Sequence, residues 1–102
     1  MTKRVYIPNK TPHDFSGAWD FGELVFCTTG ELHRLDALTM QAELERSMVD
    51  ADEEDYILVS SLTSLCSIAC AIFAARFGRL NLLIFDNGKY HARTLQLETA
   101  SA

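Results

Sequence analysis

The chain has 102 residues, the size of one domain, and 48% of them are apolar. A chain of this length can bury roughly two-thirds of the surface that its unfolded form exposes, so its composition argues against disorder and favours a single core. The formal net charge of −5 argues against a general nucleic-acid binder, which needs a basic face, and against binding to an anionic membrane.

The three cysteines, Cys27, Cys66 and Cys70, form an odd set without a CxxC spacing. Cys66 and Cys70 are four residues apart in an apolar segment, so we expect them to share one helix face as small core residues. A zinc site needs further ligands at suitable spacing, and we predict neither a metal nor a cofactor. Free thiols and the lack of a long apolar segment predict a soluble, cytoplasmic protein.

The first third of the chain alternates strand and helix signals. Residues 5–8 predict a strand that either ends at Pro8 or lies near a sheet edge, and a turn is predicted over residues 9–12. Residues 13–22 predict a short helix, because Asp14 can cap it and Gly22 can stop it. Residues 23–29 predict a second strand.

Residues 32–49 predict a longer helix with two apolar stripes. At 100° per residue, four side chains fall within one narrow arc and are predicted to form the core face, namely Leu35, Leu38, Ala42 and Val49. Met40, Leu44 and Met48 form a second stripe. This second stripe either flanks the core or faces a partner subunit.

The second half of the chain begins with a charged loop over residues 50–55. The unbroken apolar run that follows predicts a third strand over residues 56–60, covered on both faces. A third helix is predicted over residues 62–77, with Gly78 as its stop. A fourth strand over residues 80–85 leads into the turn Asp86-Asn-Gly88, a strong hairpin signal, and residues 89–97 return antiparallel.

One side of the predicted helix 62–77 carries only small residues, which are Ser64, Ser67, Ala71, Ala74 and Ala75. Small side chains let another backbone approach closely. This side therefore packs either against the protein's own sheet or against a helix of a second copy, and we expect a homo-oligomer.

The element order predicts an α/β fold, a small three-layer, Rossmann-like sandwich. Right-handed crossovers make the sheet mostly parallel, with the order 2-1-3-4-5 and an antiparallel C-terminal edge strand. We expect one domain over residues 1–98 and a tail over residues 99–102.

In such sheets a ligand binds outside the carboxyl ends of the strands, where the strand order reverses. The polar residues predicted at this end are Asn9, His13, Asp14, Thr28, Thr29, Ser60, Ser61, Thr63 and Ser64. Residues 60–64 also precede a helix, whose N-terminus favours a phosphate group. Capping and loop chemistry is the alternative role for these side chains.

Two further features suggest other functions. His13 beside Asp14 suggests hydrolysis, although adjacency in sequence does not establish the geometry of a triad and there is no GxSxG motif. The acidic residues within 43–55 form either a docking surface for a basic partner or a solvated helix end.

Segments 5–9, 13–16, 21–22, 56–58 and 78–84 (VYIPN, HDFS, FG, YIL and GRLNLLI) resemble small uncharacterised proteins of bacteriophage and prophage origin. The resemblance implies an accessory protein that binds a host molecule, in the host cytoplasm, and it carries over no catalytic residue. Our hypothesis is a non-enzymatic module that sequesters a nucleotide-like or phosphorylated host signal and so evades host defence. The alternatives are an inhibitor of a host protein, acting through its acidic or apolar surface, and a small hydrolase.

Overall fold

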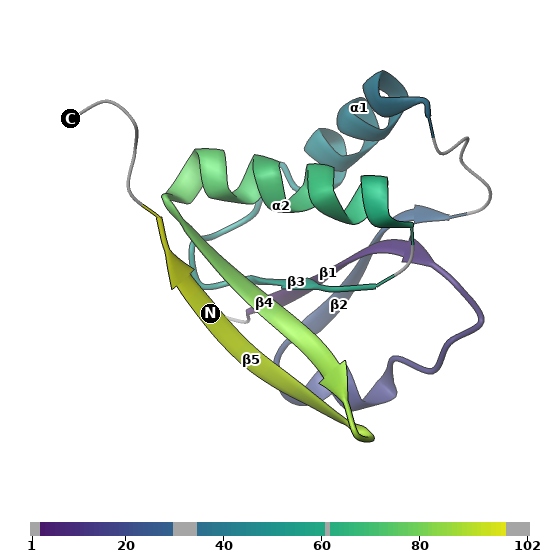
Figure 1. The fold of residues 1–102 in the computed structure, drawn as a ribbon, viewed down its shortest axis with the longest axis vertical. Coiled ribbons are helices and arrows are strands. Elements are labelled where there is room, and N and C mark those ends of the chain that lie inside the picture. Colours follow the sequence, from purple (N-terminus) through teal and green to yellow (C-terminus); the bar gives the residue numbers. More distant parts are fainter. Residues whose placement is uncertain (1–2, 30–34, 61, 98–102) are drawn as a thin grey trace.

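In the computed structural model, which describes residues 3–29, 35–60 and 62–97, five strands form one sheet (Figure 1). The strands are β1 (Arg4–Lys10), β2 (Glu23–Thr29), β3 (Tyr56–Leu58), β4 (Arg79–Asp86) and β5 (Lys89–Gln96). Their order is β2-β1-β3-β4-β5, and only the β4–β5 pair is antiparallel. The predicted α/β class, strand order and antiparallel edge are therefore confirmed.

Both α-helices, α1 (Ala37–Ser47) and α2 (Thr63–Phe77), lie on the same side of the sheet, as Figure 1 shows. The helix predicted over residues 13–22 is a five-residue 3-10 helix, η1 (Ser16–Asp20). Asp14 does not cap a longer helix, because its carboxylate accepts the Ser16 N–H at 2.9 Å and closes a local turn. This segment covers the opposite side of the sheet.

Two apolar clusters lie on the two faces of the sheet, because side chains alternate along the central strands. On the helix side, Tyr6 and Ile57 pack with residues of α1 and α2. On the η1 side, Val5 and Ile7 pack with Phe15 and other residues. The predicted third strand is thus covered on both faces at Ile57 and Leu58, whereas Val59 is 41% exposed.

The predicted core face of the helix over residues 32–49 is wrong. Leu35, Leu38 and Val49 are 78%, 81% and 71% exposed, and Ala42 is exposed too. The opposite stripe is the core face, and its three members, Met40, Leu44 and Met48, are fully buried.

The shorter length of α1 explains this error. Asp36 caps α1 by accepting the Thr39 N–H at 3.3 Å, and the helix ends at Ser47, so Leu35 and Val49 lie outside it. Without those two residues, the longest apolar stripe is the row spaced by four that consists of Met40 and Leu44 within the helix and Met48 at its C-cap. These methionines are buried within the protein and cannot contact a partner subunit.

Helix α2 turns its small residues away from the sheet. Its buried residues are Leu65, Ala69, Ile72 and Phe73, whereas Ser67, Ala71 and Ala75 are exposed. The small-residue side therefore does not pack on the sheet, contrary to one of the two predicted roles. The helix ends as predicted at Gly78, whose positive φ of 65° and N–H bond to the Ala74 carbonyl form a left-handed cap.

The β4–β5 hairpin turns at Asn87 and Gly88, which both have positive φ angles, 52° and 79°, as a type I′ turn requires. Strand β5 forms the sheet edge, and apolar side chains near it remain accessible on the helix side, including Ile84 and Leu95. No helix of the described residues is long and apolar enough to cross a membrane. The predicted tail over residues 99–102 lies outside the described residues.

Candidate functional site

The structure divides the predicted site residues among three places. Asn9 and Thr28 face each other in the β1–β2 register, and the buried Thr28 hydroxyl lies 2.8 Å from both the Pro8 carbonyl and the Asn9 side-chain oxygen. Thr29 is exposed and pairs with Lys10 at the ends of the same strands. Thr28 thus uses its hydroxyl to hold β1 against β2, which is a structural role.

His13 and Asp14 lie on the η1 side of the sheet, away from the other predicted residues. The His13 ring packs edge-on against Phe15 and Phe85, with centroids 4.9 and 5.5 Å apart, and its Nε2 is 3.4 Å from the Tyr90 hydroxyl. Asp14 instead accepts hydrogen bonds from Ser16, which lower the pKa of its carboxyl. The two residues therefore do not form the His–Asp pair that a hydrolase needs.

An open hollow of about 670 Å³ lies between η1 and the β4–β5 turn. Its walls include aromatic side chains, Phe85 and Tyr90, and three charged ones, Asp14, Asp20 and Lys89. The mixed charge gives this hollow no clear preference for an anion or a cation.

A second hollow, of about 570 Å³, runs between α2 and β4, and we call it the α2 groove. It is lined by Val59, Ser60, Thr63, Cys66, Ser67, Cys70, Leu80 and Leu82. The predicted residues Ser60 and Thr63 thus lie where strand β3 ends and α2 begins, as the strand-end rule requires. Ser64 lies beside α1 instead, with its hydroxyl 3.8 Å from the Met40 sulfur, and Ser61 lies outside the described residues.

Cys66 and Cys70 line this groove and are half-buried, and Cys70 also packs against the core cluster on the helix side, so the predicted core role holds in part for Cys70. The pKa of Cys66 is lowered to about 6, chiefly by a hydrogen bond from Cys70. A hydrogen bond from the Ser60 backbone lowers it further, whereas burial raises it. The hydrogen bond between the two thiols raises the pKa of Cys70, because its proton is held between the two sulfurs. The sequence contained a usable signal: Thr63, Cys66, Ser67 and Cys70 follow a helical spacing and form a polar stripe.

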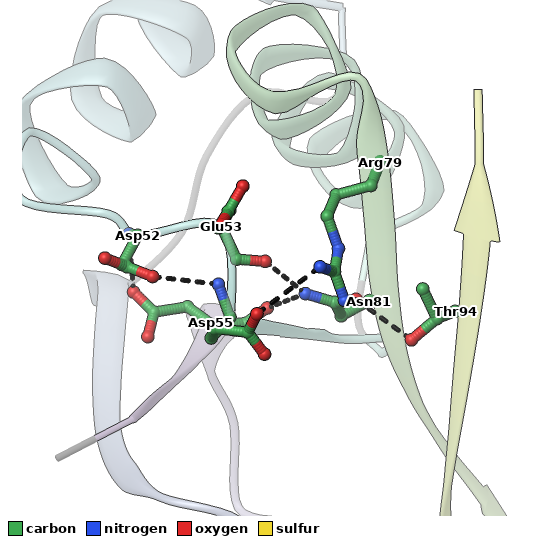
Figure 2. Close-up of polar contacts among 7 residues, drawn as sticks. Asp52, Glu53, Asp55, Arg79, Asn81 and Thr94 are labelled. Atoms are coloured by element: carbon green, nitrogen blue, oxygen red, sulfur yellow. Dashed lines mark hydrogen bonds and ion pairs between the residues drawn. The ribbon is translucent and has the colours of Figure 1, made fainter. Parts of the chain in front are cut away.

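A third polar region, at the amino ends of β3 and β4, fixes the acidic segment (Figure 2). The buried Asn81 amide donates to the carbonyls of Glu53 and Asp55 at 2.7 and 2.8 Å. Its oxygen accepts from Arg79 at 3.1 Å and from Thr94 at 2.9 Å. All four hydrogen-bonding positions of this amide are therefore used within the protein.

The buried Asp55 completes this cluster, which we call the Asn81 network. Its two carboxylate oxygens accept the backbone N–H groups of Arg4 and Asp52, at 2.9 and 2.8 Å. Arg79 also forms an ion pair with Glu54 at 3.4 Å, while its buried Nε has no partner among the described residues. Much of the acidic segment is therefore tied to the sheet.

No group of three or more His, Cys, Asp or Glu side chains in the described ranges is placed to hold a metal ion. Residues 3–99 match the family described as Phage Pam3 gp32-like protein, and the chain belongs to this family. No curated protein and no solved structure matches the chain. The predicted resemblance to phage proteins is therefore confirmed.

Proposed function

We propose that this protein is a non-enzymatic binding module, which holds a small nucleotide-like or phosphorylated ligand in the α2 groove. The observation that carries the proposal is the make-up of the groove. Although the chain has a net charge of −5, no carboxylate is among the residues that line this hollow. No carboxylate of the lining would therefore repel an anionic ligand, and the negative charge that the groove itself holds is that of the Cys66 thiolate.

The lining suits a ligand with an apolar or planar body and a polar head. Leu80 and Leu82 offer an apolar floor, and the hydroxyls of Thr63 and Ser67 stand along one wall. Pockets of this kind, mostly apolar with a few polar groups that fix orientation, are typical of small-molecule sites.

One cation lies on the same face of the sheet as the groove floor. Arg93 on β5 is the register partner of Leu82, and directly opposed residues share one face of an antiparallel pair. Its guanidinium donates to the Ala92 carbonyl at 2.7 Å, which leaves further donors on the same group. A phosphate seated near the start of α2 would find Arg93 on the helix side of the sheet.

Membership of a phage family supports a particular use for such a module. We propose that it sequesters a nucleotide-like signal of the host and thereby protects the phage from host defence. Sequestration needs a pocket and no catalytic group, and neither His13 nor Asp14 lines the α2 groove.

The test is calorimetric titration of a nucleotide panel against two matched variants, Thr63→Glu and Thr39→Glu. Both threonines are exposed and lie in the first turn of a helix, where an acid favours folding. Only Thr63 lines the groove. We expect wild type and Thr39→Glu to bind one nucleotide equally, and Thr63→Glu to bind it at least tenfold more weakly. Failure of wild type to bind any member, or equal binding by both variants, would contradict the proposal.

A second candidate is a protein-interaction module, supported by the exposed apolar residues around the same groove. Val59, Ile84, Leu95 and Leu97 are between 36% and 48% exposed on and near β4 and β5. Apolar surface gathered in one region is a feature of interaction sites. A second copy bound there would form the expected homo-oligomer. Light scattering that reports only an 11.4 kDa species would exclude binding of a second copy.

A further inference from the structure

The two thiols of the α2 groove are placed differently from the third cysteine. Cys66 and Cys70 lie one helical turn apart, and both face the hollow. Cys27 lies in the core cluster on the helix side and is only 8% exposed. Burial raises the pKa of Cys27 to about 12, so this thiol stays protonated.

The surroundings of Cys66 favour its ionised form. Ser60 and Cys70 line the groove together with Cys66, and hydrogen bonding from Cys70 and from the Ser60 backbone lowers the pKa of Cys66, which favours the thiolate over the thiol. Cys66 also lies in the first half of α2, where the helix dipole favours negative charge. The thiolate is the reactive form of cysteine, and a reactive cysteine must also be accessible. Cys66 meets both conditions.

We propose that Cys66 is a site of reversible modification by small disulfides, with the α2 groove seating the incoming molecule. The Cys66 thiolate attacks one sulfur of a disulfide such as oxidised glutathione. The original S–S bond breaks, a new S–S bond joins Cys66 to one glutathione, and the second glutathione leaves as a thiolate that takes a proton from water. The exchange needs no other oxidant.

The groove suits such a reagent. Its volume of about 570 Å³ is open to the surface, and its lining contains no carboxylate that would repel the negatively charged glutathione. Arg93 lies on the same side of the sheet, as described above.

Cys70 should not displace the bound glutathione. A disulfide needs Cβ atoms about 3.5–4.5 Å apart, whereas residues four apart on a helix hold them at about 5–6 Å. An internal Cys66–Cys70 bond would therefore require α2 to unwind. Cys70 instead acts as a positioning residue, which holds the Cys66 thiolate through its S–H group.

The inference does not rest on nucleotide binding, although both use one groove. Its test is incubation of the reduced full chain with oxidised glutathione, followed by intact mass and peptide mapping. We expect one glutathione per chain, located on Cys66. Loss of two hydrogens without added mass, which indicates an internal disulfide, or modification at Cys27 or Cys70, would overturn the proposal.

The pH dependence separates activation by Cys70 from simple exposure. In wild type, the rate of glutathione addition should rise with a midpoint near pH 6, the pKa of Cys66. In Cys70→Ala, the midpoint should move toward about 8.5, the value of a free cysteine. A thiolate with a higher pKa is a better nucleophile, which partly offsets the smaller thiolate fraction in Cys70→Ala. The rate of glutathione addition at pH 7 should therefore change little, whereas at pH 6 it should fall about tenfold.

Two control variants complete the experiment. Cys70→Ser keeps a hydrogen-bond donor at this position and should retain a midpoint well below that of Cys70→Ala. Cys27→Ser should leave both the yield and the midpoint unchanged, because Cys27 lies in the core. A wild-type midpoint near 8.5, or equal midpoints for wild type and Cys70→Ala, would overturn the role of the thiol pair.

Discussion

The Asn81 network and the α2 groove both gather polar side chains near β4, yet they use them in opposite ways. In the network, Asn81 and Asp55 are buried and direct their polar atoms to partners within the protein (Figure 2). In the groove, hydroxyls and thiols surround a hollow of about 570 Å³. Polar groups with all their bonds satisfied internally stabilise the fold, whereas those that line a hollow can bind a ligand.

The largest effect on stability should come from Asn81→Ala. The change removes the donors to the Glu53 carbonyl and the buried Asp55 carbonyl, and it removes one acceptor shared by Arg79 and Thr94. We expect a loss of about 3 kcal/mol in the free energy of unfolding, because several polar groups are left unsatisfied. Urea denaturation followed by circular dichroism measures this loss.

Thr94→Val is the control for this prediction. It removes one hydroxyl from the same amide and keeps the side-chain shape, while Arg79 still donates to the Asn81 oxygen. We expect a loss of about 0.5–1 kcal/mol. If Asn81→Ala costs no more than Thr94→Val, the network does not carry the stability assigned to it.

The smallest effect on stability should come from Ser67→Ala in the groove. The Ser67 hydroxyl donates only to the Thr63 carbonyl within α2, at 2.8 Å, and alanine favours a helix more than serine does. The free energy of unfolding should change by less than about 0.5 kcal/mol, whereas nucleotide affinity should fall about threefold to tenfold. A variant that loses stability but keeps its affinity would place Ser67 with the structural residues.

The fold could be predicted largely from the sequence, because the continuous apolar strands and the hairpin turn at Asn87 and Gly88 have few alternative arrangements. The buried face of α1 could not be predicted, because it depends on where the helix begins and ends. The predicted ends lie two or more residues outside the observed ones. Two features of the sequence indicated the correct face, namely the capping residue Asp36 and the row of Met40, Leu44 and Met48.

The candidate site was predictable in part. Ser60 and Thr63, which the strand-end rule selected, both line a hollow. It misplaced His13 and Asp14, because the segment after β1 crosses to the η1 side and packs on Phe85 and Tyr90. Cys66 and Cys70 were missed as site residues because cysteine within an apolar helix is usually a core residue.

The central claim is that the α2 groove is the ligand site. It is tested most directly by recording backbone amide chemical shifts of the labelled protein while the nucleotide panel is titrated. The account predicts that the largest shifts occur at Ser60, Thr63, Cys66 and Ser67, and that Asn81 and Asp55 hardly change. Largest shifts at Lys89 and Tyr90 beside η1, or no shifts with any nucleotide, would contradict it.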